Sequence, residues 1–263
     1  MEGLMKKFLI VLLVLGSIVV STIPPLKAGQ SLTAYTTRID YATGLGFRFL
    51  NRTITWDNKE HSSSLKASII TAQFSFSTDF GVTLTPIIGI VFHNFDNLIF
   101  RQLPISVELE VGNMSGWIFG GDLSWNFIDY SGIGAGVKGE FLYALGNTNN
   151  WAIPGLAVEG NLQGKPTWWQ ARVGPVITYT GLENLTPFLW TGLSPLRGNF
   201  SLEETIETLQ RTEDKELQGK SLVFVTLGST LNLSSINVIF GLDLFPSKDG
   251  LDTGASLQIM YSF

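Results

Sequence analysis

The chain has 263 residues, of which 15% are charged, with no cysteine, 28 glycines and a formal charge of −5 at pH 7. The lack of cysteine excludes disulfide frameworks, thiol nucleophiles and cysteine-ligated metals, and the acidic balance argues against nucleic acid, which needs a basic surface. Typical soluble domains carry about 25% charged residues, so this chain is poor in charge for a protein that folds in water.

The first 28 residues have the layout of a secretory signal peptide. Lys6 and Lys7 precede an apolar run from Phe8 to Val20, and cleavage is plausible after Ala28. The run is shorter than the roughly 20 residues that a spanning helix needs, so we expect cleavage rather than a retained anchor. Removing residues 1–28 leaves 14 basic and 21 acidic side chains, a formal charge of −7. Residues 29–37 would then be a short lead-in, and 38–263 the folded domain.

Apolar and polar residues alternate along most of the chain from Arg38 onward. A period of two places successive side chains on opposite faces of a strand. The alternation predicts twelve strands, near residues 38–50, 65–77, 82–92, 105–111, 117–127, 133–145, 151–162, 167–180, 187–196, 223–233, 236–245 and 255–263. Because the pattern weakens over 151–196, ten strands are the alternative.

Polar stretches predict the connections between these strands. The long loops are 51–64, 93–103, 197–220 and 246–253, and the tight turns are 78–81, 112–116, 129–132, 181–185 and 234–235. Within 197–220, Ser201-Leu202-Glu203-Glu204 fits a capping box, and Leu202, Ile206 and Leu209 recur at helical spacing. We therefore expect one short solvated helix in this loop, with a lid or a partner-binding segment as the alternative.

The last seven residues, 257–263, alternate apolar and polar side chains and end on Phe263. An apolar edge strand of this kind invites pairing with other chains, which a soluble domain avoids. The ending resembles the terminal strand of bacterial outer-membrane β-barrels. The resemblance implies an up-and-down antiparallel barrel in the outer membrane, whose last strand pairs with the first and is recognised by the insertion machinery. It also implies that both termini and the short turns are periplasmic and the long loops are outside.

The same alternation assigns a set of charged side chains to the lumen. These are Arg48, Glu108, Glu110, Asp122, Lys138, Glu140, Glu159, Arg172 and Asp243. Asp122 is expected opposite Lys138 in a cross-strand pair. The set is either a structural salt-bridge cluster that fills a narrow barrel or a constriction that selects solutes by charge. Apolar residues share the lumen parity, so we expect a mixed and partly filled interior: Ile118, Leu142, Val176, Ile239 and Phe245.

Aromatic residues are expected in two girdles at the membrane interfaces. Trp117, Tyr143, Tyr179, Trp190, Tyr261 and Phe263 fall at predicted periplasmic strand ends, and Trp125, Phe127, Trp169 and Phe92 near the outer ends. A sugar-stacking track would instead need rings on the lumen face, where Trp168 is the exception.

Enzymatic activity is the second class of function that the sequence raises. Outer-membrane phospholipases and lipid A deacylases are barrels with a His and a Ser two residues apart on one strand, and His61-Ser62-Ser63 reproduces that spacing. Gln73 or Glu60 could orient the base, but the triplet lies in a serine-rich loop. His93 is expected to begin a loop without clustered ligands, so neither a metal site nor a cofactor is predicted.

These observations predict an all-β transmembrane barrel that binds the lipid bilayer and no nucleic acid. Its expected role is non-enzymatic, either a porin-like channel for small solutes or a structural barrel. A lipid-modifying barrel enzyme is the alternative, and a secreted barrel that binds an apolar ligand is the third reading.

Overall fold

The computed structural model describes residues 39–56, 61–100, 107–152, 160–206, 209–248 and 250–263. Among them, no helix is long and apolar enough to cross a membrane. The predicted signal peptide and lead-in lie outside the described residues. The regular structure comprises β1 (Ile39–Trp56), β2 (His61–Thr78), β3 (Val82–Phe100), β4 (Val107–Tyr130), β5 (Ile133–Gly146), β6 (Asn149–Ala152), β7 (Gly160–Tyr179), β8 (Leu185–Leu193), β9 (Leu196–Ile206), β10 (Leu209–Gly219), β11 (Val223–Leu233), β12 (Ile236–Ser247) and β13 (Gly250–Ser262).

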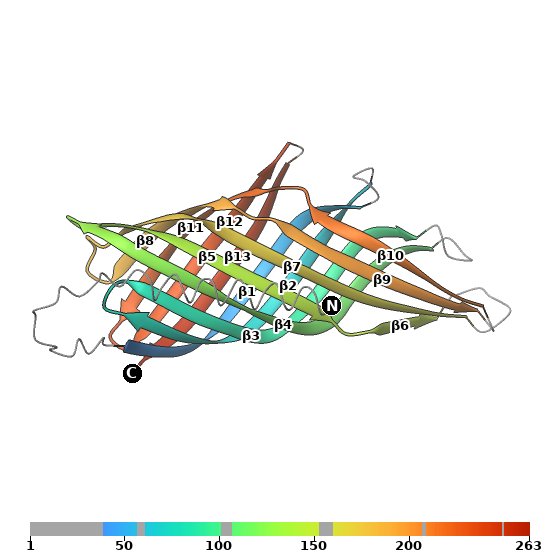
Figure 1. The fold of residues 1–263 in the computed structure, drawn as a ribbon, viewed down its shortest axis with the longest axis horizontal. Helices are drawn as coiled ribbons and strands as arrows, with labels where there is room; N and C mark the ends of the chain where they lie inside the picture. Colours follow the sequence, from blue (N-terminus) through green and yellow to red (C-terminus); the bar gives the residue numbers. More distant parts are fainter. Residues whose placement is uncertain (1–38, 57–60, 101–106, 153–159, 207–208, 249) are drawn as a thin grey trace, which may run out of the picture. The chain divides into compact units, whose positions relative to one another are not determined.

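Ten of these strands form a closed antiparallel ring, which confirms the predicted up-and-down barrel. The ring runs β1-β2-β3-β4-β5-β7-β8-β11-β12-β13 and returns to β1. The first and last strands pair from Ala42↔Ser262 to Leu50↔Gly254, as the terminal strand predicted. β6, β9 and β10 continue β5, β8 and β11 beyond short interruptions, so that β5 and β6 both pair with β7, as do β8 and β9 (Figure 1).

The expected count of twelve strands was too high by two, and the alternative of ten is correct. The segment 112–116, predicted as a turn, lies inside the single long strand β4, where Asn113 has a φ of 58°. The β3–β4 register shifts between His93 and Phe95 and again before Leu98. An extra residue in one strand produces a local bulge that resembles a turn in sequence but leaves the strand continuous. Residues 160–179 are likewise one strand, β7.

The helix expected in residues 197–220 is wrong, because this segment forms the hairpin of β9 and β10. Leu202 and Glu204 of β9 are buried, while their neighbours are more exposed, which is the alternation of a strand. β9 pairs with β7 from Gly160↔Ile206 to Gln170↔Leu196 and with β10 on its other side. Hydrogen bonding on both edges and burial of one face outweigh the weak helical propensity of a short segment.

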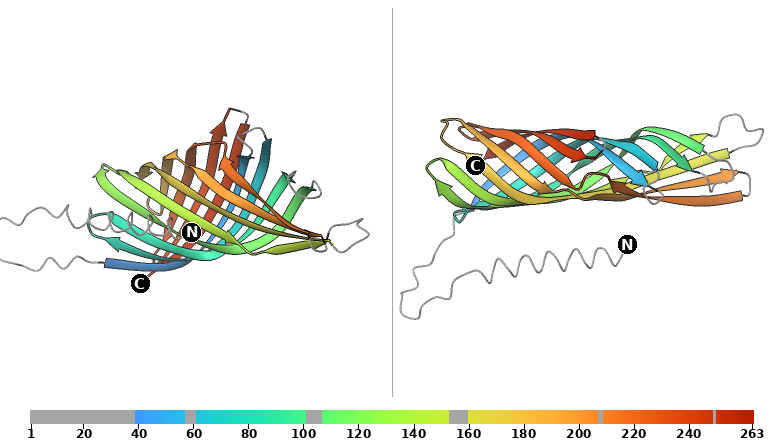
Figure 2. Two further views of the ribbon diagram at one scale, coloured as in Figure 1. Left: turned by 45° about the vertical axis from the view of Figure 1, so that its right-hand side comes forward. Right: turned by 90° about the horizontal axis from the view of Figure 1, so that it is seen from above.

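The barrel has two distinct ends. The turn end carries the short connections at 79–81, 131–132, 180–184 and 234–235 together with Phe263. The opposite end, here called the loop end, carries the strand ends Trp56, His61, Phe100, Val107, Gly160, Ile206 and Leu209. Figures 1 and 2 show β9 and β10 running together to the loop end. Because 112–116 is not a turn, the turn at 129–132 lies at the turn end rather than on the outer side.

An apolar belt covers the outside of the ring, and every ring strand contributes to it. Its exposed members include Ile39, Leu45, Phe47, Phe49, Ile70, Phe74, Leu84, Ile88, Trp117, Phe119, Ile133, Val137, Val173, Ile177, Leu189, Leu193, Val223, Leu227, Phe240, Leu242, Leu257 and Ile259. From Ile39 to Phe49 the strand spans about 33 Å, or about 25 Å along the axis of a barrel whose strands tilt by about 40°. That height matches the hydrocarbon band that outer-membrane barrels present to lipid.

A charged side chain near the middle of the belt should destabilise the barrel. Leu45 is 54% exposed and lies midway along the apolar part of β1. We expect Leu45→Arg to lower the free energy of unfolding by about 2–4 kcal/mol, and Ser68→Arg at the edge of the belt by about 0–1 kcal/mol. Urea titration in phospholipid bilayers measures both. Equal effects at the two positions would contradict the placement of the belt.

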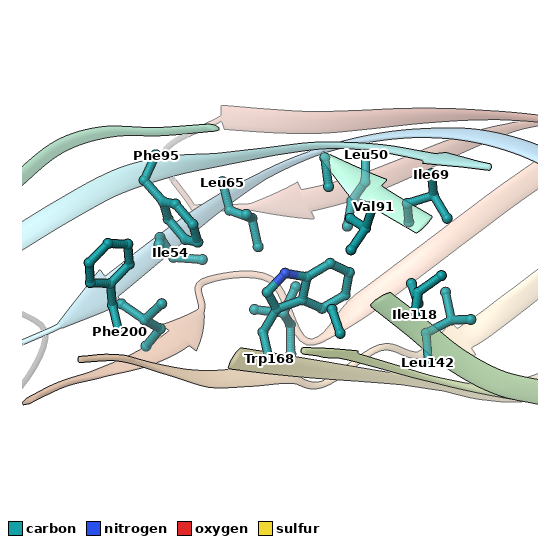
Figure 3. Packing of buried hydrophobic residues seen from close by; sticks show 14 of the residues in the cluster. Leu50, Ile54, Leu65, Ile69, Val91, Phe95, Ile118, Leu142, Trp168 and Phe200 are labelled. Carbon is teal, nitrogen blue, oxygen red and sulfur yellow. The ribbon is translucent and has the colours of Figure 1, made fainter. Parts of the chain in front are cut away.

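The interior beyond the belt, toward the loop end, is a packed apolar core. Figure 3 shows side chains of facing strands pointing toward one another across it, among them Phe95, Phe200 and Trp168. The Phe95 and Phe200 rings meet edge to face with centroids 5.3 Å apart. Trp168, the ring that shares the lumen parity, is fully buried here, and its Nε1 donates to His93 Nδ1 at 3.0 Å. The barrel wall therefore extends past the membrane band as a filled structure.

Candidate functional site

Four side chains form a bonded chain of charges across the lumen, here called the lumen ionic cluster: Arg48, Glu140, Arg172 and Asp243. Both Nη atoms of Arg48 donate to Glu140, at 2.7 and 2.6 Å. Arg172 donates to the same carboxylate through Nε and Nη2, both at 3.0 Å, and through Nη1 to Asp243 Oδ1 at 2.8 Å. Glu140 thus accepts two bidentate guanidinium contacts, a geometry that fixes orientation as well as charge.

The cluster ties together strands that are far apart in the ring. Glu140 and Arg172 are direct cross-strand partners on β5 and β7, but Arg48 comes from β1 and Asp243 from β12. Thr226 of β11 donates to Asp243 Oδ1 at 2.5 Å. Since Glu140, Arg172 and Asp243 are each at most 5% exposed, water competes weakly for these bonds. The cluster therefore acts as a cross-brace in the middle of the barrel.

Aromatic rings close over one side of the ionic cluster. The Arg172 guanidinium carbon lies 4.5 Å from the centroid of the Trp190 ring and 5.5 Å from that of Phe224. Trp190 was expected in an interfacial girdle, but it is 3% exposed and points into the lumen. Its strand begins at Leu185 rather than near Pro187, and β8 pairs with both β7 and β11 so that Trp190 opposes Val176 and Thr226. Stacking of this kind stabilises a desolvated cation.

Asp122 and Lys138 form an ion pair, although not in the expected register. Asp122 lies directly opposite Glu140, and Lys138 opposite Ser124, because the β4–β5 register shifts between Asn126 and Ile128. The Lys138 Nζ reaches diagonally to Asp122 Oδ2 at 3.6 Å. Its ammonium also lies 5.2 Å from the Trp190 ring centroid. The pair is adjacent to the lumen ionic cluster and is more open to water, with 28% of the Lys138 side chain exposed.

A second buried cation, Arg52, was missed because residues 51–64 were expected to be a loop. Arg52 is completely buried and donates through Nη2 to the Ser221 carbonyl at 2.7 Å and through Nη1 to Ser194 Oγ at 3.1 Å. Its guanidinium carbon lies 4.0 Å from the centroid of the Phe245 ring. Ser194 and Ser221 mark the breaks between β8 and β9 and between β10 and β11, so Arg52 binds polar groups that the interrupted strands leave unpaired. Arg52 lies four residues after Arg48 and therefore on the same face of the strand, and this spacing could have placed Arg52 in the lumen.

The remaining predicted lumen charges are Glu108, Glu110 and Glu159. Glu108 and Glu110 lie on β4, and the backbone of Glu108 pairs with Ile99. Glu159 lies outside the described residues. Ile118, Leu142, Val176 and Phe245 are buried inside the barrel, in keeping with a mixed interior.

Two cavities border the barrel wall. A cavity of about 20 Å³, bordered by Arg48, Thr71, Gln73, Ser256 and Gln258, has room for about one water molecule. A larger space of about 270 Å³ lies at the loop end, bordered by Thr55, His61, Ser62, Gln218, Gly219, Lys220 and Leu222. Neither provides a continuous path along the lumen through the described residues.

The interfacial aromatics other than Trp190 lie at the outside of the barrel, some at the end opposite to the one expected. Tyr179, Tyr261 and Phe263 lie toward the turn end, and Tyr261 and Phe263 stack with centroids 6.4 Å apart. Trp169 lies toward the loop end, as expected. Trp117 and Tyr143 also lie toward the loop end, and Trp125 and Phe127 toward the turn end, the reverse of the expectation. These ends are reversed because β4 continues through 112–116 without a turn, so that β4 and β5 run opposite to the expected directions from Gly116 onward.

The histidines lie in strands rather than in loops. His61 begins β2, and Ser63, two residues on, donates its hydroxyl proton to the Asp96 carbonyl rather than to an imidazole nitrogen. Gln73 donates to Thr71 Oγ1 at 3.2 Å, and Glu60 lies outside the described residues. His93, expected to begin a loop, is buried in β3 and binds Trp168. Among the described residues, no group of three acidic or histidine side chains is arranged to hold a metal ion.

Comparison with known proteins gives structural likeness without sequence likeness. No protein-family model and no curated protein match the chain. The outer-membrane protease OmpT from Escherichia coli aligns with a TM-score of 0.48 at 10% identity, over 87% of this chain and 97% of that chain. Ail, the attachment invasion locus protein of Yersinia pestis, aligns with a TM-score of 0.33 at 10% identity, over 86% and 97%.

The toluene transporter TodX of P. putida aligns with a TM-score of 0.37 at 10% identity, over 83% of this chain and 66% of that chain. All three are bacterial outer-membrane β-barrels. At these TM-scores the likeness carries no argument about activity. The closed ring, the apolar belt and the lumen ionic cluster stand on the chain's own structure.

Proposed function

We propose that the chain is a non-enzymatic β-barrel of the bacterial outer membrane whose closed lumen makes it an anchor, and that it presents the strands of its loop end to the outside. The observation that carries this proposal is the lumen ionic cluster, in which Glu140 is held by Arg48 and Arg172. A belt about 25 Å high supports embedding in a bilayer. Export by a cleaved signal peptide and insertion through the terminal strand belong to the same proposal.

A filled lumen favours the structural version of this role over the porin-like one. A selective pore needs charged groups that face a continuous water path. Here the charges bind one another, and around them lie Leu142 and Trp190, each at most 3% exposed, and the apolar core. A cluster of this kind can brace a barrel wall without any passage of solute.

The two alternative functions receive less support from the geometry. For a lipid-modifying enzyme, the serine hydroxyl must lie within hydrogen-bond reach of the histidine, whereas Ser63 is bound to the Asp96 carbonyl. For a secreted barrel with an apolar ligand, the outside should be polar and the inside open. The outside instead exposes Leu45, Phe47 and Phe49 on one strand alone.

Conductance across a planar bilayer tests the closed lumen. We expect the purified full chain to give no single-channel steps above the background of the bilayer. Co-flotation with liposomes shows in parallel that the protein has inserted, so that an absence of conductance steps cannot be due to a failure of insertion. Stable steps from inserted protein would contradict the closed lumen and support the porin-like role instead.

A further inference from the structure

The exposed charges of the barrel differ between its two ends. At the turn end the exposed acidic residues are Asp79, Asp129 and Glu183, and no basic residue lies there among the residues that the structure describes. Every described basic residue that is exposed lies toward the loop end instead: Lys165, Arg197, Arg211, Lys220 and Lys248. Basic side chains of the described wall therefore meet lipid headgroups at the loop side of the apolar belt.

A row of directly paired residues gives the height of Arg197 above the belt. The row starts in the middle of the belt, passes once around the wall and returns to β1 ten residues later: Leu45, Ala72, Ile88, Phe119, Tyr143, Trp169, Arg197, Gln218 and Thr55. Ten residues of a tilted strand span about 25 Å along the barrel axis, so each of the eight steps climbs by about 3 Å. Arg197, six steps from Leu45, therefore lies about 6 Å beyond the edge of a belt that is about 25 Å high. Headgroups occupy this level, because the polar region of a bilayer extends about 5–8 Å beyond the hydrocarbon core on each side.

The neighbours of Arg197 in this row suit a phosphate at the same level. Trp169 lies directly opposite on β7 and Gln218 on β10, and Tyr143 precedes Trp169 in the row. Tryptophan and tyrosine are typical of lipid–water interfaces. Arg197 is exposed and makes no ion pair with another described side chain. A guanidinium binds phosphate oxygens through two parallel hydrogen bonds, and the neighbouring Gln218 amide can donate a third.

Acidic side chains on the outer face lie beyond the level of Arg197. On β10, Glu216 is two residues farther from the belt than Gln218. Asp252 points inward, where it accepts a hydrogen bond from the Thr53 backbone amide at 2.8 Å. The described outer-face acids toward the loop end are all farther out: Asp96, Glu203, Asp214 and Glu216. An anion at the headgroup level therefore meets a cation before it meets a carboxylate.

A cavity adjoins Gln218 at this border of the belt. The space of about 270 Å³ is bordered by Gln218, Lys220 and Leu222 and by His61 and Ser62 of β2. Leu222 is 53% exposed at the edge of the belt, whereas Lys220 is an exposed cation. Pockets for drug-sized ligands have about 300–1,000 Å³, so this cavity suits a fragment of a headgroup rather than an acyl chain.

We propose that Arg197 binds the phosphate of a lipid headgroup in the loop-side leaflet, with Trp169 beside it and the rest of the headgroup in the cavity next to Gln218. The ligand class is a lipid that carries a phosphate monoester, because its charge and its terminal oxygens match a guanidinium. The inference rests on the proposed function, which places the belt in a bilayer. A lipid bound there holds the base of the β9–β10 hairpin at the membrane surface.

Phosphatidic acid is the probe, because its headgroup is a phosphate monoester, and phosphatidylcholine with the same acyl chains is the reference. Native mass spectrometry of the full chain released from zwitterionic micelles counts the bound lipids over a titration. We expect one saturable phosphatidic acid site, about fivefold tighter than any phosphatidylcholine site, since a basic side chain at an anionic surface contributes about this factor. Glycerol phosphate, the headgroup without acyl chains, should not compete at equal concentration.

Arg197→Gln removes the cation and keeps an amide in its place. It should lower the affinity for phosphatidic acid about fivefold, to that for phosphatidylcholine. Lys165→Gln is the matched control, because Lys165 is an exposed cation on β7, opposite Ser201 and four residues farther from the belt than Trp169. This variant should keep the affinity of the unmodified chain.

Co-flotation of each variant with phosphatidylcholine liposomes reports membrane embedding separately. Loss of flotation would count against the proposed function, whereas normal flotation without a headgroup preference would count against this inference alone. Two further results would overturn the inference. They are equal losses of affinity in Arg197→Gln and Lys165→Gln, and competition by glycerol phosphate as strong as by the lipid, which would make the site one for soluble anions.

Discussion

Replacing Arg172 with methionine should lower the free energy of unfolding by about 3–5 kcal/mol, the cost typical of removing one partner from a buried ionic group. Arg172 donates to Glu140 and Asp243 and is 4% exposed. Without it, two buried carboxylates remain with Arg48 as the one guanidinium of the cluster. Methionine keeps most of the apolar stem volume, so the loss measures charge and hydrogen bonding rather than a cavity.

Lys138→Met is the matched control for this prediction. Lys138 is on the strand next to Arg172, contacts Asp122 at 3.6 Å and leaves 28% of its side chain exposed, although Asp122 is only 9% exposed, so we expect a smaller loss of about 1–2 kcal/mol. Adding Asp243→Asn to Arg172→Met should restore part of the stability, because Asp243 is the buried carboxylate that is left without a guanidinium, whereas Glu140 keeps Arg48. Urea titration in micelles, followed by tryptophan fluorescence, measures all three variants. Equal losses for Arg172→Met and Lys138→Met would refute the role of the cluster as a brace.

The alternation of side chains carried most of what could be predicted about the barrel. Two faces alternate strictly in a strand, so Arg48, Glu140, Arg172 and Asp243 were assigned to one interior from four separate segments. Their mutual contacts were beyond prediction, because they depend on which strands face each other across the ring and on its tilt. A charged constriction and a structural brace would contain the same residues, and the bidentate contacts of Glu140 are what distinguish the brace.

The errors in strand count and in strand direction share one physical origin, the similarity of bulges and turns in sequence. Glycine and asparagine around Asn113 suggested a turn, yet β3 and β5 pair with β4 and hold the backbone extended on either side of a bulge. A single misplaced turn assigns the ends of every following strand to the wrong side of the barrel, until a second error restores the correct assignment. Trp117 and Trp125 were therefore assigned to opposite ends from the ones they occupy.

The prediction for residues 197–220, which form the β9–β10 hairpin, failed for a different reason. Leu202, Ile206 and Leu209 fit helical spacing over a short window, but Leu202 and Glu204 also fit a strand, and short windows do not separate the two periods. Pairing with β7 decides the outcome, and it involves residues some forty positions earlier in the chain. Arg52 was missed because the serines and charges near it suggested a loop rather than a strand beyond the membrane.

Gly174→Ala should destabilise the barrel by about 3 kcal/mol, the upper range for overpacking a close contact. A Cβ at this position would lie 1.9 Å from the Thr191 carbonyl oxygen and 2.8 Å from the Gly192 Cα, both backbone atoms that cannot rotate away. Gly174 lies on the β7–β8 pairing that closes the ring, between the pairs Val173↔Leu193 and Val176↔Trp190. Pro175 offers no amide there, so close packing of the two glycines holds the strands together.

Gly139→Ala adds the same methyl group on the neighbouring strand and isolates this effect. Its Cβ would meet only the Arg172 carbonyl oxygen, at 3.8 Å, which is an ordinary contact. We expect little change or a slight gain in stability, since alanine restricts the unfolded chain more than glycine does. Migration of unheated samples in detergent gels reports the folded fraction of each variant at rising urea. If Gly174→Ala were as stable as Gly139→Ala, the ring would have to close without close approach of β7 and β8, and the placement of Trp190 beside Arg172 would lose its support.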